Sequence, residues 1–205
     1  MTRQGRPAAG QRIEEILAAA VTVFAERGYQ ATSMTDLASA AGISKPGLYH
    51  HVSSKEEILV LIYRAAIARN VQDAEEVLAS GASATEMLRD ILRRLAVHSC
   101  VNQKLVRIFN EEEAAVPPSV MDVVHAAVRE REDLLIRLVR EGVGAGEFKL
   151  TVSPRLAARA MIGACNLCYK WFDPAGSKTA DDIGNEMAQF LVSALTGPQP
   201  AGGRG

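Results

Sequence analysis

The chain has 205 residues, 48% of them hydrophobic, so it can bury a substantial core. Its 23 basic and 24 acidic residues nearly cancel, which excludes a uniformly basic nucleic-acid-binding protein but not a local basic surface. Three cysteines are too few for a disulfide framework. The sequence shows no secretory signal and no apolar stretch of about 18 residues. We therefore expect a cytoplasmic protein that does not span a membrane.

The N-terminal part of the chain follows a helical pattern. Apolar residues recur at helical spacing over about 11–27, and Gly28 suits the position just beyond the C-terminus of that helix. Ser33, with Asp36 three residues later, has the capping-box pattern that starts a second helix, which should end near Gly42. This region is therefore predicted to begin with a long helix followed by a short one.

A third, short helix is predicted after Ser44, because Pro46 is tolerated in a first helical turn. Ser54 and Glu57 form a second capping-box pattern, which opens a long fourth helix extending to Ala79. Three helices thus precede a long one, and the second and third of them are short.

The rest of the chain is also helical in pattern, with breaks at Gly and Pro residues. The predicted fold is all-α: an N-terminal three-helix domain with the helix order of a helix-turn-helix, followed by a larger helical domain. The helices of the larger domain are expected at about 84–100, 102–114, 119–141, 154–172 and 180–195. The predicted divisions are a flexible basic arm (1–9), the three-helix domain (10–70, with its helix-turn-helix motif at 33–52), the larger domain (71–197) and a flexible tail (198–205).

The second and third helices, joined by a turn at Gly42, have the arrangement of a helix-turn-helix, which lays its second helix in the major groove of DNA. Charge is distributed accordingly. Residues 1–55 hold six basic and four acidic residues, whereas the remainder of the chain holds 17 and 20. The helix predicted to contact DNA presents Ser44, Lys45, Pro46, Gly47, Tyr49, His50 and His51.

The run SMTDLASAAGISKPGLYHHVSSKEE at 33–57, preceded by Gly28-Tyr29, resembles the DNA-binding domain of the tetracycline-repressor (TetR) family. The resemblance extends over about residues 10–70. It implies that Thr35 and Lys55 contact backbone phosphates while the third helix faces the groove. It also implies that 10–70 form a DNA-binding domain and 71–197 a ligand-binding and dimerisation domain, in a homodimer that binds a palindromic operator in double-stranded DNA. One departure is Val52, where the family usually has Phe, which predicts slightly looser packing behind the third helix.

The predicted 154–172 helix is apolar nearly all round, and a helix without a polar face must be covered on both sides. In a chain of this size, a second copy of the protein is the best candidate for the missing cover. The family resemblance likewise implies a dimer formed by a C-terminal pair of helices. The residues predicted at the dimer interface are Trp171, Met187, Phe190, Leu191 and Ala194.

Residues 163–176 resemble a subgroup of these regulators, several of which respond to acyl-CoA. An effector of that kind needs an apolar tunnel with cationic groups at its mouth, for which Arg93, Arg94, Lys104 and Arg107 are candidates. A drug-like ligand or thiol oxidation is the alternative signal. The asparagines are candidates because a polar amide on an apolar helix must find a partner. The residues predicted to bind the effector are Asn102, Arg107, Phe109, Asn110, Val128, Met161 and Asn166.

Other classes of function fit less well. Cys165 and Cys168 lie three residues apart, but a structural zinc site needs four ligands and no second such pair exists. We predict buried, inert thiols, with no metal and no cofactor. The acidic run 111–113 ends a helix, and His125 has no nucleophile within reach. No phosphate-binding loop or nucleophile elbow is present, so the protein is not expected to be an enzyme; a helical enzyme is the least favoured alternative.

Overall fold

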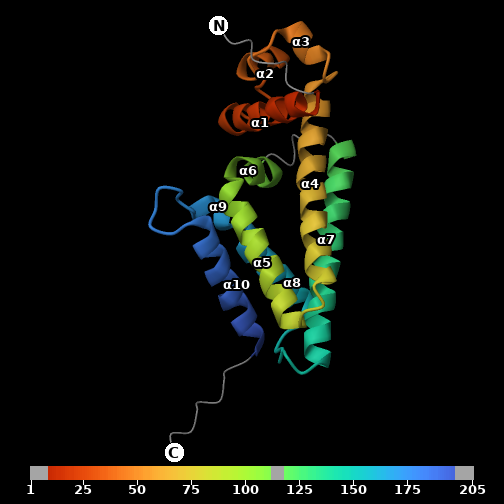
Figure 1. Ribbon diagram of the computed structural model, residues 1–205, viewed down its shortest axis with the longest axis vertical. Helices are drawn as coiled ribbons and strands as arrows, with labels where there is room; N and C mark the ends of the chain where they lie inside the picture. The colour runs from red at the N-terminus through yellow and green to blue at the C-terminus, as the bar shows by residue number, and fades with distance from the viewer. Residues whose placement is uncertain (1–8, 112–117, 197–205) are drawn as a thin grey trace, which may run out of the picture. The chain divides into compact units, whose positions relative to one another are not determined.

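The structure, a computed structural model, describes residues 9–111 and 118–196, and these form helices joined by turns and loops (Figure 1). The predicted all-α fold is confirmed. Apart from Ala9, the predicted arm and tail lie outside the described residues. None of the described helices is long and apolar enough to cross a membrane. The helices are α1 Ala9–Arg27, α2 Met34–Ala40, α3 Lys45–Tyr49, α4 Lys55–Ala79, α5 Ala84–Val101, α6 Gln103–Glu111, α7 Pro118–Gly144, α8 Pro154–Asn166, α9 Cys168–Trp171 and α10 Ala180–Thr196.

The chain forms two compact units. Unit 1 comprises residues 1–68 and 104–124, and unit 2 comprises residues 69–103 and 125–205. The chain therefore passes from one unit to the other three times: within α4, at the start of α6 and within α7. The predicted division of the chain at residues 70 and 71 stays a prediction; α6 and the first part of α7 contribute side chains to the core of unit 1. Ile108 of α6 and Val124 of α7 are buried in the same cluster as the apolar residues of α1 to α4.

The core of unit 1 forms beneath α2 and α3, which lie on the same side of α1 (Figure 1). Phe24 of α1 is 0% exposed, and its ring meets the ring of Tyr29 edge-on with centroids 5.2 Å apart. Leu37 and Ala38 of α2 are buried against them. The left-handed backbone of Gly28, with φ +80°, ends α1 and turns the chain toward α2, as predicted.

Polar caps determine where the helices of unit 1 begin. The Asp36 amide donates to the Ser33 hydroxyl at 3.2 Å, and the Ser33 amide donates to the Asp36 carboxylate at 2.9 Å, which confirms the first predicted capping box. The second box is only half right. The Glu57 amide donates to the Ser54 hydroxyl at 3.0 Å, but the Glu57 carboxylate accepts instead from the amide of Ser53, at 2.6 Å.

Unit 2 is built on α5, which packs closely against α10 and also contacts α8 and α9 (Figure 1). Gly184 of α10 makes the close approach to α5 possible. A Cβ atom at this position would lie 2.5 Å from a methyl group of Val97 and 3.0 Å from the carbonyl oxygen of Arg93. Leu88 and Leu92, both 0% exposed, form the α5 side of the resulting core.

The helix predicted over 154–172 is broken at Leu167, where α8 ends and α9 begins. The cause is a buried side chain of α5. The Ser99 hydroxyl donates to the Asn166 carbonyl at 2.8 Å and accepts from the Tyr169 amide at 3.1 Å. In an uninterrupted helix both groups would bond within the helix itself. Ser99 is 1% exposed, so its hydroxyl satisfies these two backbone groups in place of the helical bonds and without admitting water.

Candidate nucleic-acid interface and effector unit

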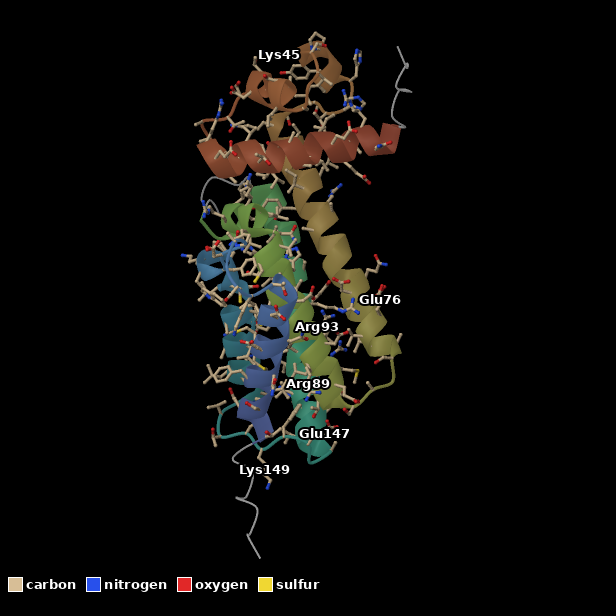
Figure 2. The ribbon with its side chains drawn as sticks, turned by 60° about the vertical axis from the view of Figure 1, so that its left-hand side comes forward. Lys45, Glu76, Arg89, Arg93, Glu147 and Lys149 are labelled. Atoms are coloured by element: carbon tan, nitrogen blue, oxygen red, sulfur yellow. The ribbon has the colours of Figure 1, made fainter. Side chains whose placement is uncertain are left out.

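The short helix α3 has a buried side and an exposed side. Leu48 is 0% exposed and Val52, just beyond the helix, is 2% exposed, so these two residues anchor α3 on the core of unit 1. Tyr49, next to Leu48, is 49% exposed. Lys45 extends from the start of α3, clear of α1 (Figure 2). Six of the residues predicted to contact DNA in and around α3 are exposed: Ser44, Lys45, Pro46, Tyr49, His50 and His51.

Ser44 and Gly47 together hold the first turn of α3. The Gly47 amide donates to the Ser44 hydroxyl at 3.1 Å, which satisfies one of the free N–H groups of the helix start. A Cβ atom at position 47 would lie 3.1 Å from the same oxygen, closer than an ordinary contact. Gly47 is half-buried, and its lack of a side chain therefore leaves room for the cap.

Lys55, at the start of α4, braces the loop between α1 and α2. Its Nζ donates to the backbone carbonyls of Tyr29 at 2.7 Å and Gln30 at 3.3 Å, and lies 4.4 Å from the centre of the Tyr29 ring. An ammonium group has three N–H donors, so these carbonyls use two of them. A DNA phosphate would share the ammonium with the loop. The phosphate contacts of Lys55 and of Thr35, which is exposed on α2, stay predictions.

The asparagines predicted to meet an effector have partners within the chain. The Asn102 side-chain amide donates to the His98 carbonyl at 3.1 Å, and that of Asn110 donates to the Val106 carbonyl at 2.8 Å. In both cases the acceptor lies four residues earlier. These local bonds already meet the requirement that a polar amide on an apolar helix be satisfied. Asn166 is half-buried, at the end of α8.

The other predicted effector residues are divided between the two units. Met161 lies in the core of unit 2 and is 3% exposed, whereas Val128 of α7 is 41% exposed. Arg107 and Asn110 are exposed residues of α6 in unit 1. The Phe109 side chain lies outside the part of the chain that the structure describes. Of these residues, Met161 alone is placed by the described structure in the buried core of unit 2.

Two of the arginines considered for ligand phosphates are engaged in ion pairs within unit 2. Arg93 and Arg94 extend from α5, and Arg93 is labelled in Figure 2. Such half-exposed pairs contribute only about 0–1 kcal/mol each, but they occupy the guanidinium donors before any ligand arrives. The distances are 3.1 and 3.4 Å from Arg93 to Asp90 and Asp181, and 3.0, 3.0 and 3.1 Å from Arg94 to Asp73, Glu76 and Asp90.

Unit 2 exposes several large apolar side chains on α8, α9 and α10. Among the residues predicted at the dimer interface, Trp171 and Phe190 are 54% and 67% exposed, Ala194 is exposed, Met187 is half-buried, and Leu191 is buried in the core of the unit. Sequence reasoning missed Leu156 and Leu167, which are 55% and 50% exposed. Their spacing of 11 residues, three helical turns, places them on one face and would have been the signal for them.

The burial predicted for Cys165 and Cys168 is confirmed, and Cys100 is buried beside them. Burial is the main reason that the pKa values of the Cys165 and Cys168 thiols rise to about 12. Oxidation proceeds through the thiolate, so protonated thiols of this kind react slowly. Within the described residues, no group of three His, Cys, Asp or Glu side chains is placed to hold a metal ion.

A short capped helix with an exposed polar side, packed on two other helices and followed by a second helical unit, defines a helix-turn-helix regulator. Residues 81–195 match the model of the tetracyclin repressor-like C-terminal domain, and residues 16–62 match that of bacterial regulatory proteins of the tetR family. The chain therefore belongs to the TetR family. This is a family of DNA-binding transcriptional regulators rather than of enzymes.

Similar proteins include transcriptional regulators of bacteria. An HTH-type transcriptional repressor, KstR2 of Rhodococcus jostii, is 28% identical over 91% of this chain and 92% of its own. The fatty acid metabolism regulator protein of Bacillus subtilis is 24% identical over 94% of this chain and 98% of its own. The crystal structure of AibR in complex with isovaleryl coenzyme A and operator DNA has a TM-score of 0.77, with 27% identity over 92% of this chain and 100% of that one.

Proposed function

We propose that this protein is a homodimeric transcriptional repressor that binds a palindromic operator and releases it when a hydrophobic acyl thioester binds unit 2. The observation that carries the proposal is the division of α3 into an anchored side and an exposed polar side. Leu48 holds the helix while Lys45, Tyr49 and the two histidines point outward. A major groove is read by side chains near the start of such a helix.

The exposed apolar residues of unit 2 support a dimer. Trp171 and Phe190 are more than half exposed, and large aromatic side chains in contact with water are costly unless a partner covers them. Leu156 and Leu167 extend the apolar surface along α8. A second copy of the same surface would supply the cover, and a two-fold dimer would place two copies of α3 on the two halves of a palindrome.

An acyl thioester is the effector class that the relatives favour. AibR is described in complex with isovaleryl coenzyme A, and the Bacillus subtilis relative is named as a regulator of fatty acid metabolism. The core of unit 2 consists of apolar residues such as Leu88, Leu92 and Met161, which are chemically suited to contact an acyl chain. Release then follows if the effector binds more tightly to a conformation of the dimer that does not fit the operator.

A gel shift tests the proposal. The purified protein is titrated onto the DNA upstream of its own gene, in excess competitor DNA, with and without dodecanoyl-CoA. A specific complex that dodecanoyl-CoA dissociates is the expected result. A complex that ignores dodecanoyl-CoA, isovaleryl-CoA and free CoA would retain the DNA-binding regulator and reject the thioester. If no specific complex forms on any DNA selected from the genome, the proposed function is wrong.

A further inference from the structure

Arg131 occupies an unusual position on α7, on the side that faces the core of unit 2. Leu135 and Leu138, four and seven residues further along the same side of the helix, are 0% and 1% exposed. Arg131 as a whole is half-buried, but its Nε atom is fully buried and has no hydrogen-bond partner among the described residues. Charged side chains rarely reach such a position without a partner.

The contrast with other arginines of unit 2 is informative. Arg93 and Arg94 each contact two or more carboxylates, and Arg159 of α8 contacts Glu132 at 2.9 Å. Within the described residues, Arg131 makes no ion pair of this kind. Arg93, Arg94 and Arg159 thus have carboxylate partners, whereas Arg131, on the core side of α7, has none among the described residues.

The Cys165 thiol, an ionisable group that interacts with Arg131, does not neutralise it. The Cys165 thiol on α8 lies close enough for the two groups to shift one another's titration. Its raised pKa, about 12, keeps that thiol protonated and uncharged at neutral pH. Burial lowers the pKa of Arg131 for the same physical reason, because a charge in an apolar environment loses its hydration. An anion placed beside the guanidinium would offset this loss.

We propose that Arg131 binds an anionic oxygen, a carboxylate or a phosphate, on an otherwise apolar effector. The inference rests on the proposed effector response of unit 2 and adds the residue and the chemical group that it recognises. A guanidinium group offers planar paired donors that match both kinds of oxyanion. The buried Cys165 thiol is uncharged and so leaves the charge of the guanidinium uncompensated. A neutral lipid would leave the guanidinium unpaired, so the site selects for charged amphiphiles.

Calorimetric titration of the full-length protein tests this assignment with three probes that share one chain length. Dodecanoate carries a carboxylate, dodecanoyl-CoA carries phosphates, and dodecanol carries no charge. Arg131→Met removes the charge but keeps an apolar stem, and Arg137→Met, at an exposed position on the same helix, is the matched control. We expect Arg131→Met to bind at least one charged probe tenfold or more weakly, with dodecanol unaffected, and Arg137→Met to behave as wild type.

The pattern of loss identifies the anion. Weaker binding of dodecanoate alone assigns a carboxylate, and weaker binding of dodecanoyl-CoA alone assigns a phosphate of the coenzyme. If Arg131→Met does not fold, Arg131→Lys carries the same titration, because it keeps the charge and removes the paired donors. If each of the three probes binds the folded variant as tightly as it binds wild type, the inference is overturned.

A second measurement tests the anion site at Arg131 independently of the proposed acyl-thioester effector. The thermal midpoint of the protein without lipid is measured in chloride and in phosphate buffer of equal ionic strength. We expect Arg131→Met to raise the midpoint in chloride, since it removes an uncompensated charge, and phosphate to stabilise wild type more than the variant. If wild type binds no lipid probe but shows this phosphate effect, the proposed thioester is wrong and the anion site stands. A lower midpoint for the variant, with equal phosphate effects, overturns the anion site.

Discussion

Units 1 and 2 arrange their important side chains in opposite ways. In unit 1 the candidate DNA-binding residues Lys45 and Tyr49 are exposed on α3, while Leu48 within that helix and Val52 just beyond it hold it on the core. In unit 2 the distinctive polar groups lie inside: Ser99 is 1% exposed and the Nε of Arg131 is fully buried. The difference teaches that exposed side chains of α3 such as Tyr49 can be replaced without changing the stability of unit 1, whereas in unit 2 binding and stability are linked.

The largest expected effect is on folding of unit 1, through Leu48→Ala. Truncating a fully buried leucine costs about 2–5 kcal/mol in the free energy of unfolding, so this variant should unfold at much lower urea concentration. Tyr49→Ala, at the next residue but on the exposed side, should stay within about 0.5 kcal/mol of wild type. Urea unfolding followed by circular dichroism measures both. Equal stability of the two variants would mean that α3 is not anchored as described.

In unit 2, Gly142→Ala should destabilise the protein although alanine favours helices. A Cβ atom at position 142 would lie 2.2 Å from the ring of Phe148, which is 2% exposed. Overpacking of this kind costs about 1–3 kcal/mol. Gly144→Ala is the control, because nothing lies within 4 Å of its Cβ and its backbone is not left-handed. Thermal unfolding should show a lower midpoint for the first variant only; the reverse order would refute this packing.

Tyr49→Ala tests whether the exposed side of α3 contributes to DNA affinity. If Tyr49 contacts base edges or the groove wall, its loss should weaken the operator complex by about 1–3 kcal/mol while leaving the fold and the dimer unchanged. Fluorescence anisotropy with labelled operator measures the affinity, and sedimentation checks the dimer. Tyr49→Phe separates the hydroxyl group from the ring. A folded Tyr49→Ala variant with wild-type affinity would remove Tyr49 from the interface.

Lys55→Ala should have the smallest effect. It distinguishes a lysine that only supports the α1–α2 loop from one that also contacts a DNA phosphate. Loss of the two bonds to the α1–α2 loop should cost about 1–2 kcal/mol of stability, a modest change for charge-assisted bonds at a half-exposed site. If Lys55 also binds DNA, the slope of log affinity against log salt concentration should fall by about one phosphate for each copy of the variant. An unchanged slope with lower stability would leave Lys55 as a brace only.

Unit 1 was largely predictable from the sequence because its structure depends on local signals. Ser33 with Asp36, Ser44 with Pro46, and Gly28 each specify a helix end within four residues, and the structure has all three. The break at Leu167 was not predictable in this way. It depends on Ser99, 68 residues earlier in the chain. The hydroxyl of Ser99 replaces backbone hydrogen bonds that an uninterrupted 154–172 helix would make.

The same distinction applies to the candidate sites. The exposed residues of α3 follow from the spacing around Leu48, so the sequence identified the surface. The effector residues could not be identified by type, because Asn102 and Asn110 prove to be satisfied by their own helices. Arg131 carried no signal in the sequence: an arginine on α7 resembles a surface residue until the burial of its Nε is known.

The most direct test of the account is the linkage between the two units. If the effector releases the operator, the operator must weaken effector binding by the same factor, because coupling free energies are reciprocal. Dodecanoyl-CoA would be titrated into the protein alone, into its complex with operator DNA, and into protein with scrambled DNA of equal length. The account predicts weaker binding only with operator, by the factor with which dodecanoyl-CoA weakens the DNA complex. Equal affinity in all three titrations would contradict it.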